Sequence, residues 1–254
     1  MFIGERTGAI ALKHFDTILC ASGFAAAGFA LAHPNTLIIE ETEFADAFRC
    51  APLRGFACPD YKPQTGKGAE LLSLMERNGL LRDGLVCVNA LESILCEYLK
   101  GKDVSMLLKA HVLNAAEAVK TGRLSVYTNS GVLSFCADTV LFAPEPEART
   151  LSVLFACEKP DPAVFSEVFP GSFAEPAFYP DRRVVYVDVP KDVEWNDFRA
   201  DVLERCRKLD DAAKVLYMAP VPGARCGNLP HPVAQFERGL SASADAFAFD
   251  PKEV

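Results

Sequence analysis

The segment from Phe15 to Glu40 constrains the fold of this chain more than any other part of it. An apolar run at 18–20 meets a cluster of small residues, and an Ala-rich segment then leads to a second apolar run that ends at Glu40. This order of strand, tight turn, helix, strand and acid is typical of a dinucleotide-binding βαβ unit. Glu40 lies nineteen residues after Ala21 (40 − 21), close to the spacing at which such an acid binds the ribose hydroxyls.

The small residues of the turn are Ala21, Gly23 and Ala26, where three glycines are usual. Gly23 lets backbone N–H groups approach a pyrophosphate, and Ala26 lets the helix pack close to the strand. Ala21 is less suited to its position, because a tight turn favours a residue without a Cβ atom. The same pattern is also compatible with a plain βαβ unit that binds no ligand.

Two segments, 16–40 and the block from Val104 to Pro144, carry a resemblance to a known family. The chain is similar there to FAD-dependent oxidoreductases of the glutathione-reductase-like group. The resemblance implies an α/β fold, in which a Rossmann-like FAD/NAD(P)-binding domain carries an inserted α+β substrate domain. The expected division is a dinucleotide (FAD)-binding domain at 1–145, a substrate domain with an antiparallel sheet at 146–220, and a C-terminal loop and helix at 221–254 that return to the first domain.

The resemblance also implies FAD as the cofactor and leaves the catalytic residues unidentified. It assigns cofactor contacts to Ala21, Ser22, Gly23, Ala26, Glu40, Glu41, Arg49, Val112, Ala143 and Pro144. Two motifs depart from the family pattern, because Pro144-Glu145 replaces a Thr-Gly pair and 221–232 contains no Gly-Asp pair. Glu145 would bring negative charge toward an anionic pyrophosphate, and Pro144 lacks a backbone donor. We therefore expect FAD binding to be weak or lost, or to need a protein partner that completes the site.

Apolar periodicity and turn residues predict the other elements. The predicted helices are 70–78, one that begins at Asn89, 194–209, in which Leu203 shares the apolar stripe, and 232–244. The predicted strands are a hairpin around Asn129-Ser130-Gly131, a separate strand from Asp138 to Ala143, and strands at 150–157, 183–189 and 214–219. Loops are predicted at 52–68 and 170–180.

Composition narrows the classes of partner. A net charge of −8 argues against nucleic acid, and no apolar run reaches the length of a membrane span. The N-terminal residues lack the pattern of a secretory signal, which favours a cytoplasmic protein with its nine cysteines reduced. No Cys-x-x-Cys pair is present, and we predict no metal site.

Other side chains give weaker signals. Arg49 and Arg54 flank a loop where they could bind phosphate, and His231 lies between two prolines in a predicted loop where it could act as acid or base. Thr65-Gly66-Lys67-Gly68 is too short to be a phosphate-binding loop. Two functions stay open. One is an FAD-dependent oxidoreductase of unknown small-molecule substrate, and the other is a flavin-free or weakly flavin-binding homologue that acts as a partner or binding subunit.

Overall fold

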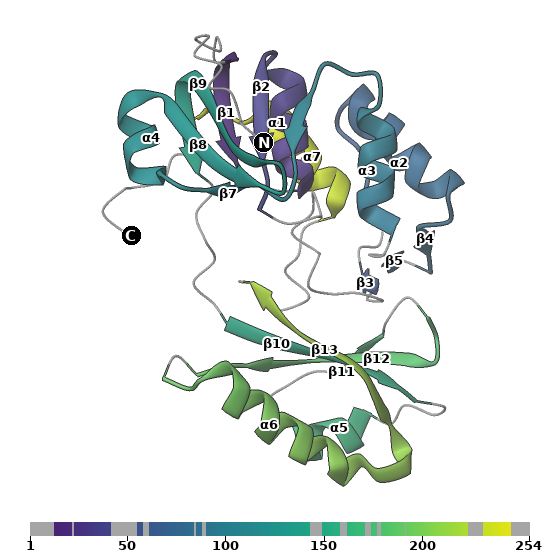
Figure 1. The fold of residues 1–254 in the computed structure, drawn as a ribbon. Helices are drawn as coiled ribbons and strands as arrows, with labels where there is room; N and C mark the ends of the chain where they lie inside the picture. The colour runs from purple at the N-terminus through teal and green to yellow at the C-terminus, as the bar shows by residue number, and fades with distance from the viewer. Residues whose placement is uncertain are drawn as a thin grey trace, which may run out of the picture.

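The structure is a computed structural model that describes residues 13–21, 23–41, 55–57, 61–83, 85–87, 90–142, 149–157, 162–170, 174–176, 179–190, 192–222 and 231–244 (Figure 1). Its largest sheet has the strand order β6-β2-β1-β9-β8-β7. These strands are β1 (His14–Cys20), β2 (Thr36–Ile39), β6 (Ser105–Leu107), β7 (His111–Val112), β8 (Arg123–Thr128) and β9 (Gly131–Phe142). Strands β6, β2, β1 and β9 pair in parallel, whereas β9, β8 and β7 pair antiparallel. The predicted α/β class is confirmed.

Strand β9 corrects one prediction. The hairpin strand after Gly131 and the strand expected from Asp138 onward are one continuous strand. Its Cys136 is in register with Arg123 of β8 on one side and with His14 of β1 on the other. The sequence pattern hides this continuity, because the apolar alternation of the hairpin breaks where β9 changes its partner.

Helices α1 (Gly23–Ala32) and α7 (Pro232–Ser241) pack directly against each other. Glycines make the close approach possible: a Cβ atom on Gly239 would lie 2.0 Å from the carbonyl oxygen of Ala25. The helix expected near the C-terminus is confirmed as α7, and it ends at Ser241 rather than at Ala244. The chain thus returns to the first sheet after forming the second one.

A helical layer is inserted between β2 and β6. It contains α2 (Gly66–Arg77), α3 (Leu91–Leu99) and a small antiparallel sheet of β3 (Gly55–Ala57), β5 (Leu85–Cys87) and β4 (Leu81–Arg82). Helix α2 ends at Arg77, and its C-cap residue Asn78 precedes the left-handed Gly79, close to the predicted end. It begins four residues earlier than expected, because Thr65 caps it. The loop predicted for 52–68 is therefore wrong at 55–57 and at 66–68. Asn89, the expected start of α3, lies outside the described residues.

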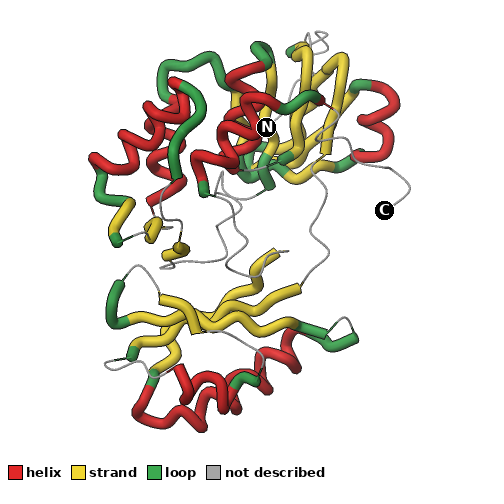
Figure 2. Tube along the Cα trace, turned by 180° about the vertical axis from the view of Figure 1, so that it is seen from behind, coloured by secondary structure: helices red, strands yellow, loops and turns green. Residues whose placement is uncertain are grey.

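The second sheet is antiparallel, as predicted, with the order β11-β12-β10-β13. Its elements are β10 (Arg149–Ala156), α5 (Pro162–Val168), β11 (Ala174–Pro176), β12 (Arg182–Asp188), α6 (Trp195–Cys206), a 3₁₀ turn (Arg207–Ala212) and β13 (Lys214–Pro222). Helix α5 and strand β11 were not predicted. We call the first sheet with helices α1, α2, α3 and α7 the first body. Figures 1 and 2 agree that α5 and α6 cover the face of the second sheet that is turned away from the first body.

Helix α6 buries Phe198, Val202 and Cys206 against this sheet, whereas Leu203 is 42 % exposed. The prediction that Leu203 belongs to the apolar stripe is wrong. Residues 198, 202 and 206 are spaced by four and lie on one face, and Leu203 lies about 100° further around the helix.

Candidate dinucleotide site at the carboxyl ends of the parallel strands

The turn from β1 into α1 has the backbone that the sequence predicts. Gly23 begins α1 with φ +88°, a left-handed conformation that side chains other than glycine rarely adopt. Ala26 is 1 % exposed and belongs to the same buried cluster as Leu19 of β1 and Ile38 of β2. The small residues therefore bring the helix close to the strands, as expected. Ser22 lies outside the described residues.

Glu40 directly follows β2 and is only 4 % exposed. Its backbone is held by the end of β6 and by the segment that follows it: its N–H donates to Leu107 O at 2.9 Å, and its C=O accepts from Ala110 N at 3.1 Å. Because β1 and β2 are parallel neighbours, Glu40 and the start of α1 lie at the same edge of the sheet. This is the edge at which ligands bind in open α/β sheets.

Glu41 and Val112 lie at the same edge. The Glu41 carboxylate is exposed, and its Oε2 is 4.0 Å from Nδ1 of the exposed His111. Val112 follows in β7. The structure therefore gathers five of the expected positions at one edge, namely Ala21, Gly23, Glu40, Glu41 and Val112. Arg49, Ala143 and Pro144 lie outside the described residues, so their assigned contacts stay predictions.

A thiol at this edge is that of Cys20, the last residue of β1. Burial, together with the nearby Glu41 carboxylate, raises the pKa of this thiol to about 12. The group is therefore a neutral thiol at physiological pH and not a thiolate nucleophile. Its role at the site is to fill space at the end of the strand.

His231 lies directly before α7, as predicted; it is the N-cap residue of this helix and is 3 % exposed. Its Nδ1 accepts a hydrogen bond from the N–H of Val233 at 3.1 Å, and its ring stacks on Tyr61 with centroids 4.7 Å apart. Burial lowers the pKa of this imidazole to about 4. The side chain is thus neutral near pH 7, with one nitrogen already committed to capping the helix.

Sequence reasoning missed Glu237, which is 7 % exposed on α7. Its carboxylate accepts hydrogen bonds from the hydroxyl of Tyr61, from the N–H groups of Gln64 (2.9 Å) and Thr65 (2.6 Å), and from the hydroxyl of Thr65 (2.7 Å). Thr65 therefore caps α2 with its side chain, and its N–H and hydroxyl groups bind the carboxylate of Glu237. One sequence signal was available, because Glu237 falls four residues after Val233 on the apolar stripe of the helix, where a charge needs partners.

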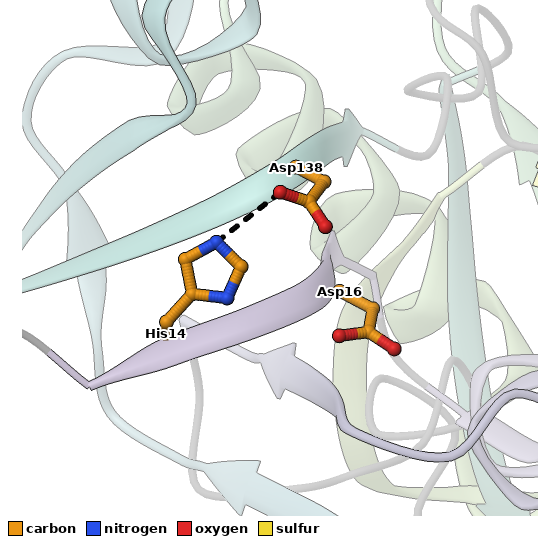
Figure 3. Close-up of side chains that lie close together, drawn as sticks. All are labelled: His14, Asp16 and Asp138. Atoms are coloured by element: carbon orange, nitrogen blue, oxygen red, sulfur yellow. Dashed lines mark ion pairs between the residues drawn. The ribbon is translucent and has the colours of Figure 1, made fainter.

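A separate cluster lies at the other end of β1. Side chains of His14, Asp16 and Asp138 bring three potential ligand atoms within 4.8 Å of one another, and all three are exposed (Figure 3). His14 Nε2 is 3.2 Å from Asp138 Oδ1, and Asp16 accepts a hydrogen bond from Asn35 at 2.7 Å. The prediction of no metal site was based on cysteine spacing alone and did not take these three residues into account. Each of the three already has a protein partner.

No protein-family model and no curated protein matches the chain. Solved structures do match. The p-nitrophenol 4-monooxygenase PnpA from Pseudomonas putida DLL-E4 is 11 % identical over 83 % of this chain and 68 % of its own, with a TM-score of 0.52. AlpK is 15 % identical over 89 % of this chain and 59 % of its own, with a TM-score of 0.53. A flavoprotein/dehydrogenase from Cytophaga hutchinsonii is 11 % identical over 83 % and 67 %, with a TM-score of 0.52.

These similarities establish the fold. The resemblance expected from the sequence is thereby confirmed at the level of the fold alone. The chain spans about three fifths to two thirds of the length of the three solved structures named above. None of the helices in the described part of the chain combines the length and apolarity that a membrane crossing requires.

Proposed function

We propose that this protein binds FAD at the carboxyl ends of β1 and β2 and acts as a flavin-dependent oxidoreductase on a small molecule. One observation carries the proposal: a left-handed Gly23 opens α1, and a buried Glu40 ends the neighbouring parallel strand. Fold alone does not determine function, so the proposed FAD site depends on these two residues and not on the similar structures.

The described residues fit the adenosine and pyrophosphate half of FAD. The absence of a Cβ atom at Gly23 lets a pyrophosphate approach the backbone at the positive end of the α1 dipole. The Glu40 carboxylate accepts hydrogen bonds from ribose hydroxyls, and the two backbone bonds to Leu107 and Ala110 keep this residue in place. Bound FAD would supply electron transfer through its isoalloxazine ring, which no side chain can supply.

A second function is favoured by the start of α7. Pro232 has no N–H group, and the N–H of Val233 is already bound by His231, so this helix end offers few donors to a flavin ring. The missing Gly-Asp pair acts in the same direction. A protein that binds the nucleotide half without flavin chemistry, as a partner or binding subunit, is therefore the alternative proposal.

The substrate is proposed to lie against the second sheet. Along β10, residues 151, 153 and 155 pack toward α5 and α6, so the alternating Ser152 and Leu154 lie on the opposite face. They are in register with Tyr186 and Val184 of β12, and all four are less than 9 % exposed. Figures 1 and 2 show that this face is turned toward the first body. Its mixture of aromatic, aliphatic and hydroxyl groups suits a small aromatic compound, the class to which the substrate named for PnpA belongs.

The experiment is a calorimetric titration of the purified apo protein with each of four nucleotides in turn: FAD, ADP-ribose, NAD and NADP. We expect Glu40→Gln to weaken FAD binding by about 1–3 kcal/mol, because the ribose hydroxyls lose a charged acceptor. Glu117→Ala, an exposed acid on α4 (Ala115–Thr121), is the control and should leave binding unchanged. FAD that binds more tightly than ADP-ribose supports the flavin proposal, and equal affinities support the alternative. Absence of binding by every nucleotide contradicts both.

A further inference from the structure

Helix α7 is held in the first body by a polar anchor built around Glu237. The carboxylate lies at the N-terminus of α2, where Tyr61, Gln64 and Thr65 all donate to it. The fit is tight, because a Cβ atom on Gly68 would lie 2.1 Å from Oε1 of Glu237. A negative charge at this position is stabilised both by the donors and by the α2 dipole. Protonation of the carboxylate weakens both contributions.

A second group of this anchor responds to acid in the same direction. His231 accepts the N–H of Val233 through its Nδ1 lone pair, and protonation of Nδ1 removes that acceptor. The imidazolium would also be a cation at the positive end of α7, in a buried position. Tyr61 links the two groups, since its ring stacks on His231 and its hydroxyl donates to Glu237.

We infer that α7 is an acid-released element: protonation of His231, followed by that of Glu237, undocks it from α1 and α2. The release is a local opening of residues 231–244. It would uncover the surface of α1 around Gly28. The inference does not depend on which ligand the protein binds.

Around the anchor at the start of α7, the other charges do not oppose this direction; at the far end of the helix, His33 Nε2 lies 3.1 Å from Ala242 O. Helix α1 carries no charged residue, and α3 contributes the uncharged Tyr98, whose hydroxyl donates to Lys67 O. From α2, the Lys67 ammonium is directed to Leu31 O, and Lys102 and Tyr98 lie near Glu70. On α7 itself Arg238 is exposed. Among the described residues, Glu237 is the carboxylate that accepts a hydrogen bond from Tyr61, and the ring of Tyr61 stacks on His231.

The sign and size of the effect follow from proton linkage. Because burial lowers the pKa of His231 to about 4 in the docked state, from 6.5 when exposed, the neutral ring stabilises docking fully above pH 6.5. This stabilisation is lost progressively as the pH falls from 6.5 to 4. Between pH 7 and pH 5 the equilibrium constant for opening should rise about twenty-fold. Glu237, whose pKa lies below its ordinary value in the docked state, adds to the effect only at lower pH.

The test is amide hydrogen exchange of the full-length apo protein at pH 7 and pH 5, resolved by peptide and corrected for intrinsic exchange rates. We expect the protection of 232–241 to fall about twenty-fold at pH 5. Peptides from β10 and β12 should keep theirs. An unchanged protection of α7, or an equal loss in β10 and β12, would overturn the inference, because the first shows no opening and the second shows global unfolding.

Two variants separate the contributions. His231→Asn keeps a side-chain oxygen that can cap α7 but removes the titrating ring, so it should abolish the loss of protection between pH 7 and pH 5. Glu237→Gln should lower the protection of α7 at both pH values and retain the fall that His231 causes. A His231→Asn protein with the wild-type pH response, or a Glu237→Gln protein with wild-type protection at pH 7, contradicts the mechanism.

Discussion

Gly28 of α1 lies so close to Phe236 of α7 that a Cβ atom on the glycine would stand 2.0 Å from the Phe236 carbonyl oxygen. This is backbone-to-backbone contact between the two helices, and it repeats at Gly239 and Ala25. No rotation of a side chain can relieve such an overlap. The Ala- and Gly-rich composition of α1 therefore serves helix packing as well as the turn that precedes it.

The first prediction concerns this contact. Gly28→Ala should lower the free energy of unfolding by about 1–3 kcal/mol, since the two helices must separate to admit the methyl group. The matched control is Gly66→Ala at the start of α2, where nothing lies within 4 Å of the added atom. It should be neutral or stabilise by about 0.5–1 kcal/mol. Urea denaturation followed by far-UV circular dichroism measures both, and equal effects would contradict the packing argument.

The second prediction concerns the buried carboxylate on α7. Glu237→Ala should destabilise the protein by about 2–4 kcal/mol, because it leaves the donors of Tyr61, Gln64 and Thr65 without their acceptor. Burial acts to raise the pKa of Glu237, but the hydrogen bonds together hold it below its ordinary value of 4.5. The carboxylate thus stabilises the fold above pH 4.5, and this contribution is lost as the pH falls through the lowered pKa.

The measurement is urea denaturation of the parent and the variant between pH 7 and pH 3. The difference in unfolding free energy should shrink below pH 4.5. Glu76→Ala, an exposed acid on α2, is the control and should change stability by less than about 0.5 kcal/mol. A difference that stays constant down to pH 3 would show that the charge of Glu237 does not matter.

The third prediction compares neighbours on α6. Val202→Ala should cost about 2–3 kcal/mol, because Val202 is fully buried against the second sheet, whereas Leu203→Ala should cost less than about 0.5 kcal/mol. The single tryptophan of the chain, Trp195, lies on the same helix and reports its unfolding by fluorescence. Similar losses of unfolding free energy at the two positions would show that Leu203 belongs to the buried apolar stripe, as the sequence predicted.

The fourth prediction concerns cysteine reactivity. In the native protein iodoacetamide should modify the exposed Cys96 well before Cys20, because burial and Glu41 raise the pKa of the Cys20 thiol to about 12. Burial raises the pKa of Cys96 as well, but its side chain is accessible. Mass spectrometry of time points identifies the sites, with denatured protein as the control in which both react alike. Early labelling of Cys20 would place its thiol in a different environment.

The first βαβ unit could be predicted from the sequence because its signals are local. Gly23, Ala26 and Glu40 each act through the backbone or through a contact with the adjacent strand, and their spacing follows directly from strand and helix geometry. The antiparallel second sheet was likewise predicted, from the order strand, strand, helix, strand. Helix α5 was missed, since seven residues starting at a proline give too short an apolar period.

The anchor of α7 could not be predicted, because its members are distant in sequence. Tyr61 and Glu237 are 176 positions apart, and no local pattern relates them. The helix that begins at Pro232 was predicted, but no local pattern indicated that the preceding His231 caps it and is buried. Long-range polar pairs of this kind become visible only when the fold is known.

Strand β9 has a consequence for how the chain reaches its native state. Its first half pairs with β8 across the short turn at 129–130, whereas its second half pairs with β1, whose residues lie 122 positions earlier in register (136 − 14). Closing a short loop costs far less chain entropy than closing one of more than a hundred residues. The hairpin is therefore the natural early structure, and it presents a ready-made template edge on which β1 docks late. We therefore expect the slow step of folding to be the pairing of β1 with β9, after the hairpin of β8 and β9 has formed.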